Sequence, residues 1–256
     1  MFIDTHCHLD DQKILDKDNV INECVKNGVN RIINMGCDVD SSIRSCELSN
    51  KYDIVYFASG IHPENANQVL EKDYKTIIDL SKKEKCVAIG EIGLDYHWVN
   101  DNKDIQKEVF TRQLDIACEI NLPVSIHSRD AAFDTVEIIK SYKNRLPRGG
   151  VMHCFSGSKE TAKIYLDCGF YLGFGGTLTF KSSTNLREVA AYTPFDRILT
   201  ETDSPYLSPE PKRGQTNMPY FVPFITAKIA EIKDISIEET TIKIKENAYN
   251  LFNKLK

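Results

Sequence analysis

The amino-acid sequence predicts an α/β fold, a (β/α)8 TIM barrel that forms one domain over residues 1–256. Three observations favour this fold. Short β-prone runs alternate along the chain with longer segments of helical period. These β-prone runs number eight, and 256 residues suit one barrel of this kind. No repeat, low-complexity tract or flexible linker divides the sequence.

The strand-like runs and the helical segments follow one another in regular order. The predicted strands are residues 2–6, 31–35, 54–59, 87–91, 123–127, 150–153, 170–174 and 197–201. The helical segments between them are roughly 16–27, 40–51, 70–83, 103–120, 131–145, 158–167 and 184–191. Strands that alternate with helices pair in parallel through right-handed crossovers, which favours a closed barrel. An open doubly wound sheet is the alternative, but no Gly-x-Gly-x-x-Gly run follows the first strand.

Two more helices are predicted after the eighth strand, beyond a proline-rich loop at 204–219. The last helix begins at Ser236, because Glu239 stands three residues later and completes a capping box. Its apolar residues recur at helical spacing and are Ile244, Ala248, Leu251, Phe252 and Leu255. This spacing is typical of an amphipathic helix.

The composition excludes several classes of function. Hydrophobic residues make up 41% and charged residues 27%, as in a globular protein with a sizeable core. The net charge of −5 gives no global attraction for duplex nucleic acid, so such a substrate must be held locally. No stretch approaches the roughly 20 apolar residues of a membrane span, and the N-terminus lacks a signal peptide's pattern. We therefore expect a cytoplasmic protein with no membrane partner and no obligate protein partner.

Eight cysteines are scattered through the sequence without any C-x-x-C pair, which favours reduced thiols. Two of them, Cys7 and Cys154, adjoin histidines that we interpret below as metal ligands. Because neighbouring residues of a strand point to opposite faces, both thiols are expected to point away from the site. We do not count them as ligands.

Four histidines and two acids lie at or just after the carboxyl ends of predicted strands. They are His6, His8, Glu91, His127, His153 and Asp203. Active sites of barrels are built at this end, and strand alternation turns His6 and His8 to the same side. A single histidine at a strand end is more often a structural residue than a metal ligand. Here the structural interpretation would have to hold separately for each of the four histidines, which favours a metal site. Six ligands are too many for one tetrahedral ion and suit two ions that share a carboxylate.

Six short motifs, in order, resemble those of the TatD family of metal-dependent deoxyribonucleases. They are HCHLD at 6–10, GIHP at 60–63, GEIGLDY at 90–96, IHSR at 126–129, HCFSG at 153–157 and ETDSP at 201–205. The resemblance runs from residue 6 to about residue 219. It implies a barrel, a divalent metal centre and phosphodiester hydrolysis. It also implies 3′-to-5′ exonuclease action on single-stranded DNA or DNA ends. RNA is an alternative substrate, and the preference between DNA and RNA stays open.

The resemblance also assigns roles to the six residues. It implies that His6, His8, Glu91 and Asp203 hold one ion, and that Glu91, His127 and His153 hold the second. Glu91 would bridge the two ions, and Asp203 would also take a proton from the attacking water. Four imidazoles favour Zn²⁺, Mn²⁺ or Fe²⁺ over Mg²⁺, whereas the family's activity suggests Mg²⁺. The identity of the two divalent cations, Mg, Mn or Zn, stays open.

Other residues near these motifs are candidates for substrate contact. His62 follows the third strand and would bind a substrate phosphate or serve a structural role. Arg129 would clamp a phosphate, or else pair with Asp130 or Asp134. Trp98, the only tryptophan, would stack on a base or pack against the protein. Glu201 would orient a ligand or be a simple strand-end acid.

The sequence departs from the family in the loop after the eighth strand. That loop usually ends in Asn-Glu-Pro, whereas this chain has Asn217-Met218-Pro219, and Gln215 and Thr216 replace a basic pair. Two other functions are compatible with the motifs. One is hydrolysis of an ester or amide, such as an aminoacyl-tRNA ester. The other is a binding protein with a structural metal, although structural zinc prefers cysteine-rich sets of four ligands.

Overall fold

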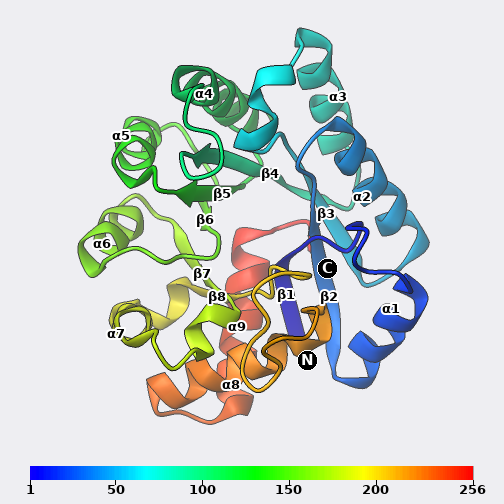
Figure 1. Cartoon of the computed structure of the whole chain (residues 1–256), viewed down its shortest axis with the longest axis vertical. Coiled ribbons are helices and arrows are strands. Elements are labelled where there is room, and N and C mark those ends of the chain that lie inside the picture. Colours follow the sequence, from blue (N-terminus) through cyan, green and yellow to red (C-terminus); the bar gives the residue numbers. More distant parts are fainter. Residues whose placement is uncertain (256) are drawn as a thin grey trace.

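The computed structural model describes residues 1–255 and contains eight parallel strands that surround a common axis, with helices outside them (Figure 1). The strands pair in chain order from β1 to β8. Their bounds are β1 Phe2–Cys7, β2 Val29–Met35, β3 Val55–Ser59, β4 Cys86–Asp95, β5 Val124–Arg129, β6 Gly150–Met152, β7 Tyr171–Phe174 and β8 Ile198–Thr200. The predicted (β/α)8 barrel is confirmed, and the open sheet is excluded.

One helix follows each of the first seven strands, and two follow the eighth. Their bounds are α1 Lys17–Lys26, α2 Val39–Lys51, α3 Glu71–Ser81, α4 Lys103–Ile120, α5 Ala132–Tyr142, α6 Lys159–Asp167, α7 Thr184–Tyr192, α8 Val222–Lys233 and α9 Ile237–Leu251. Helices α1 to α8 surround the ring of strands, whereas α9 overlaps the ring in this view (Figure 1). In the part of the chain that the structure describes, no helix has the length and apolar character needed to cross a membrane.

Strand β4 is longer than predicted and runs four residues beyond Glu91 to Asp95. It can do so because Gly93 lies beside β5, where a Cβ atom would come within 2.0 Å of the carbonyl oxygen of His127. Gly93 also has a φ of 145°, which residues with a side chain rarely adopt. The extension carries Asp95 into the same cavity as Glu91.

The barrel closes between β1 and β8 through hydrogen bonds that involve side chains and the residues after β8. The hydroxyl of Thr5 donates to the carbonyl of Thr200 over 3.1 Å, and the amide of Thr202 donates to Asp4 over 2.9 Å. Beyond them, the amide of Asp203 donates to the carbonyl of His6 over 2.9 Å. This last bond brings the segment after β8 directly against the His6 strand.

Helix α9 begins as predicted, with a capping box between Ser236 and Glu239. Its apolar residues pack against the barrel strands. The helix ends at Leu251, before the predicted positions Phe252 and Leu255. Ala248 and Leu251, together with Phe252 and Leu255 just after the helix, share one buried cluster with residues of the barrel strands, among them Ile3 and Leu199. Burial of this face anchors the C-terminal helix to the barrel.

Candidate metal centre

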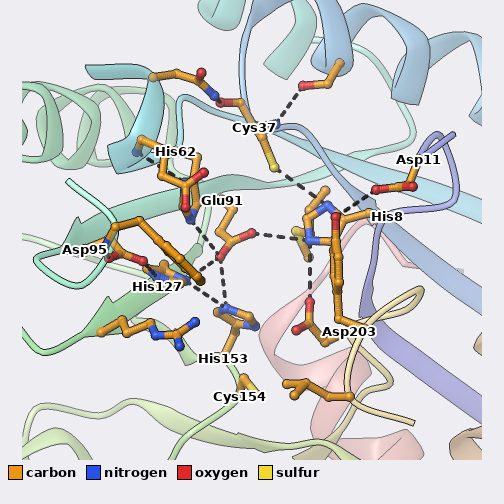
Figure 2. Close-up of a pocket in the computed structure, with 18 of the residues that line it drawn as sticks. His8, Asp11, Cys37, His62, Glu91, Asp95, His127, His153, Cys154 and Asp203 are labelled. Carbon is orange, nitrogen blue, oxygen red and sulfur yellow. Dashed lines mark hydrogen bonds and ion pairs between the residues drawn. The ribbon is translucent and has the colours of Figure 1, made fainter. Parts of the chain in front are cut away.

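A cavity of about 1070 Å³ opens among the loops that follow the carboxyl ends of the strands. Five of the six predicted ligands line it: His8, Glu91, His127, His153 and Asp203. The sixth, His6, is completely buried and lies directly behind them. Figure 2 shows His8, His127, His153 and Asp203 arranged around Glu91 in the centre of this cavity. The barrel thus brings together residues that are up to 197 positions apart in the sequence.

One oxygen of Glu91 faces the histidines of β1. Glu91 Oε2 lies 3.3 Å from His6 Nε2 and 3.5 Å from His8 Nε2. Asp203 Oδ1 completes this group, at 3.5 Å from His8 Nε2 and 3.9 Å from His6 Nε2. Donor atoms bound at about 2.0–2.1 Å around a tetrahedral ion would lie about 3.3 Å apart, so these spacings suit a shared cation.

The other oxygen of Glu91 faces a separate pair of histidines. Glu91 Oε1 lies 2.9 Å from His127 Nδ1 and 2.9 Å from His153 Nε2. The two ring nitrogens lie 3.3 Å from each other. Glu91 therefore stands between two groups of nitrogen and oxygen donors and gives one carboxylate oxygen to each.

The chemistry of these donors fits divalent cations. In the described part of the chain, His6 Nε2 is a buried ring nitrogen without a hydrogen-bond partner, although two carboxylates lie within 4 Å of it. An unpaired buried nitrogen is costly unless something else binds it. Imidazoles and carboxylates together suit zinc, manganese or iron. The predicted residues thus form a plausible metal centre, and their role as ligands remains a prediction.

In each of the four histidines, the ring nitrogen that does not face the donor groups lies near a different residue farther from the centre. His6 Nδ1 lies 3.3 Å from the hydroxyl of Ser125, and His8 Nδ1 lies 3.6 Å from the sulfur of Cys37. The remaining two histidines have carboxylates behind them: Asp95 Oδ2 lies 2.9 Å from His127 Nε2, and Glu201 Oε1 lies 3.5 Å from His153 Nδ1. Such partners fix the orientation and tautomer of metal-binding histidines.

The acids of the centre are held in their ionised form. Burial alone would raise the pKa of Glu91, but the charge of His153 and the hydrogen bond from His127 outweigh it. The pKa of Glu91 is therefore well below its usual range. Burial would likewise raise the pKa of Asp203, but the hydrogen bond from His8 and the nearby histidines lower it. Both carboxylates are available at neutral pH to bind a cation or accept a proton.

His62, predicted to contact substrate, lies at the edge of the second donor group. Its Nδ1 accepts a hydrogen bond of 3.3 Å from the backbone amide of Glu64, so the ring hydrogen resides on Nε2 in the neutral form. Nε2 lies 3.6 Å from Glu91 Oε1. Burial lowers the pKa of His62 to about 3, so the ring is neutral and serves as a donor.

Arg129 and Trp98 lie together at the cavity wall. The guanidinium of Arg129 lies 5.2 Å from the centroid of the Trp98 ring. In the described residues, the two acids considered as partners of Arg129 are engaged elsewhere, Asp130 with His97 and Asp134 with Lys107. Trp98 is 64% exposed, which argues against a role in packing.

The structure corrects the prediction for Cys154, which lines the cavity rather than pointing away. Strand β6 ends at Met152, and Cys154 has a left-handed φ of 44°, so strand alternation no longer applies to it. The prediction for Cys7 is confirmed, because its sulfur is turned toward the carbonyl of Ile33, away from the cavity.

Sequence reasoning missed Asp95 and Cys37 as partners of the centre. Asp95 is four residues after Glu91, so in one continuous strand both side chains point to the same face. Extending the predicted strand to residue 95 would therefore have placed Asp95 beside the centre. Cys37 comes two residues after β2 and carries no motif.

A model of the family of TatD related DNases matches residues 3–253 of this chain. The chain belongs to the TatD family. The uncharacterized metal-dependent hydrolase YabD of Bacillus subtilis is 45% identical over 253 residues, which cover 98% of this chain and 99% of that protein. The crystal structure of YJJV, a TatD homologue from Escherichia coli, covers 98% of both chains with a TM-score of 0.92 and 31% identity.

A further relative, the 3′-5′ ssDNA/RNA exonuclease TatD of Escherichia fergusonii, is 32% identical over 221 residues. The alignment covers 84% of this chain and 85% of that exonuclease. The predicted family and the predicted class of enzyme are thereby confirmed. This TatD-family chain is a metal-dependent hydrolase.

Proposed function

We propose that this TatD-family protein uses two divalent cations to hydrolyse phosphodiester bonds, as a 3′-to-5′ exonuclease on single-stranded DNA or DNA ends. The observation that carries the proposal is the position of Glu91, whose two oxygens face two separate donor groups. The similarity to the exonuclease of Escherichia fergusonii supports nucleic acid, DNA or RNA, as the substrate.

In this proposal His6, His8, Asp203 and Glu91 would hold one cation, and His127, His153 and Glu91 the other. When bound, such a pair supplies a water of lowered pKa and neutralises charge on the phosphate. The chain's own part is to fix this arrangement before substrate arrives. Ser125, Cys37 and Asp95 lie within hydrogen-bond reach behind His6, His8 and His127 and orient these rings. Glu201 lies 3.5 Å behind His153 and stabilises its positive charge.

Asp203 is the proposed general base. It is ionised at neutral pH and reaches the cavity from the segment after β8. As the water oxygen forms its bond to phosphorus, Asp203 accepts the proton that the water loses. The bond between phosphorus and the departing sugar oxygen breaks, and that oxygen takes up a proton.

His62 and Arg129 are the proposed substrate contacts. The Nε2 hydrogen of His62 and the guanidinium of Arg129 are donors at the edge of the cavity. Both suit the oxygens of a phosphate group, Arg129 through two parallel hydrogen bonds. His62 also donates toward Glu91, so it would orient the carboxylate when no phosphate is present.

The test is hydrolysis of a 5′-labelled single-stranded oligonucleotide by the purified protein with Mg²⁺, Mn²⁺ or Zn²⁺. Shortening of the labelled strand from its 3′ end, abolished by a chelator and by Asp203→Asn, is the expected result. A protein that leaves DNA and RNA intact with every metal would contradict the proposal. Parallel assays on aminoacyl-tRNA would then reveal ester hydrolysis.

A further inference from the structure

Two partly exposed aromatic side chains flank the candidate metal centre on different sides. Trp98 follows β4 and is 64% exposed, and Tyr206 lies in the loop after β8 and is 43% exposed. Both line the same cavity as Glu91. The guanidinium of Arg129, which is two residues after His127, lies over the ring of Trp98. The ring of Tyr206 lies 6.3 Å from the ring of His8. Each aromatic side chain is therefore associated with a different donor group.

The Trp98 loop is fixed to the second donor group through one carboxylate. Asp95 Oδ1 accepts hydrogen bonds from the backbone amides of His97 and Trp98, over 2.8 Å and 2.9 Å. Asp95 Oδ2 lies against His127. The backbone of Trp98 is thus held at a set place relative to the centre, and the indole extends from it and is exposed. Arg129 lies over the ring and the His97 ring lies perpendicular to it with centroids 4.7 Å apart, so a flat ligand would stack on the exposed part of the indole that these two side chains leave.

Tyr206 is fixed in a comparable way beside the first donor group. Its hydroxyl donates to Asp11 Oδ2 over 2.8 Å, and Lys13 Nζ lies 4.5 Å from the ring centroid. The edge-on contact with His8 places the phenol ring at the wall of the centre. The residue is 43% exposed although Lys13 lies over the ring, and an aromatic ring that is held by its polar end and partly exposed is suited to stack a planar ligand.

The charged residues of the cavity indicate which contacts can bind a nucleic-acid strand there. Of the described residues that line it, three are basic, Lys13, Arg44 and Arg129, and seven are acidic. Arg44 is already paired with Asp10 over 3.0 Å. Beyond the proposed metal ions, His62 and Arg129, basic side chains therefore supply little of the affinity for a polyanion, and the two exposed aromatic rings are available to bind bases.

We propose that Trp98 and Tyr206 are two nucleobase-stacking sites, one on each side of the phosphate that is cleaved. The inference rests on the proposed function, and it specifies the substrate as a strand with unpaired, unstacked bases. In a duplex the faces of the bases are covered by their neighbours, so neither ring could reach them. Stacking on an aromatic side chain accepts every base, so little base preference is expected.

The first test compares single-stranded DNA with the same strand carrying an abasic residue on one or the other side of the cleaved bond. Loss of one stacked base should slow the wild-type protein roughly fivefold to 150-fold. For Trp98→Leu, the rate of cleavage of the normal strand divided by that of the abasic strand should fall to about 1 when the abasic residue is on one particular side of the bond. For Tyr206→Leu, the same ratio of rates should fall to about 1 when the abasic residue is on the opposite side of the bond.

Matched variants separate stacking from general damage to the site. Trp98→Phe and Tyr206→Phe keep an aromatic ring, so their ratio of cleavage rates between normal and abasic strands should stay close to that of the wild-type protein. Phe133→Leu is the control, because Phe133 is 79% exposed and lies outside the cavity lining, and it should keep the wild-type ratio. Ratios that stay at the wild-type value in both Leu variants would overturn the inference, even while DNA hydrolysis itself stands.

A second test does not depend on turnover. Trp98 is the only tryptophan in the sequence, so the intrinsic emission at tryptophan wavelengths reports on this ring alone. A short single-stranded oligonucleotide should quench that emission, whereas a fully abasic strand of equal length should not. If DNA is not hydrolysed at all, the proposed function fails, and this quenching still decides whether bases stack on Trp98. Equal emission with both strands would overturn the stacking site.

Discussion

The carboxylate of Asp95 lies directly behind His127, with Asp95 Oδ2 2.9 Å from His127 Nε2. The opposite nitrogen of the same ring lies 2.9 Å from Glu91 Oε1. Burial alone would raise the pKa of Asp95, but hydrogen bonds from His127 and from the amides of Trp98 and His97 bring it to about 2. His127 is thus oriented from behind by an ionised carboxylate, as metal-binding histidines commonly are.

Asp95→Ala should therefore weaken metal binding at the His127 and His153 group by about 10- to 100-fold. The group around His6 and His8 should keep its affinity, because Asp95 does not face it. A titration of the metal-free protein that resolves both binding steps measures this. Asp79→Ala, which removes a surface carboxylate paired with Lys82, is the matched control. Equal weakening of both steps would contradict the assignment.

Asn217 ties the proline-rich loop to the segment that carries Asp203. Its side-chain amide donates to the carbonyls of Thr202 and Tyr206, over 2.7 Å and 2.5 Å, and the side chain is fully buried. Asn217→Ala leaves these carbonyls unpaired, so the free energy of unfolding should fall by about 1–3 kcal/mol. Urea denaturation measures the change. An unchanged midpoint would mean that water or a rearranged loop replaces both bonds.

Metal affinity should rise with pH across neutrality. Burial alone would lower the pKa of His153, but Glu91 and Glu201 outweigh it and raise the pKa well above its usual value. The metal-free centre therefore holds a proton that a cation must displace. Each proton released makes affinity rise by up to about tenfold per pH unit. Metal titrations between about pH 6 and about pH 8 check this, and a constant affinity would contradict it.

Binding of single-stranded DNA should depend only weakly on salt. In the metal-free protein, kept so by a chelator, Lys13 and Arg129 are the basic side chains of the cavity left after Arg44 pairs with Asp10. Neutralising two phosphates on a single strand gives a slope of about −1.4 for log affinity against log salt concentration. Anisotropy of a labelled strand, measured on Asp203→Asn at several salt concentrations, gives the slope. A value several times steeper would point to a basic surface outside this cavity.

The barrel was predictable because its strands and helices differ clearly in period and length. The eight strands lie where the apolar runs predicted them, and Ser236 begins the last helix as its capping pattern indicated. The end of β4 was not predictable in the same way. Gly90 and Gly93 are weak strand formers, and only the approach of His127 explains why glycine continues the strand.

The approach of the candidate site residues was predictable where ligand types lie near the carboxyl ends of strands, as at His127, two residues before the end of β5, and Asp203, three residues after β8. The parts that were missed depend on contacts between distant segments. Cys37 reaches His8 from the loop between β2 and α2, and no spacing in the sequence links them. Met218, where the family has an acid, packs against the buried cluster that includes Leu9, while Asn217 makes the polar contacts of the loop. The departure from the family pattern is therefore compatible with an ordered loop.

The most direct test of the central claim is a count of metal ions per chain, combined with anomalous scattering from a crystal to locate each ion. We predict two ions, one bound by His6, His8 and Asp203 and the other by His127 and His153. Both should touch Glu91, through different oxygens. A fully active protein with a single ion, or with ions that Glu91 does not bind, would contradict the claim.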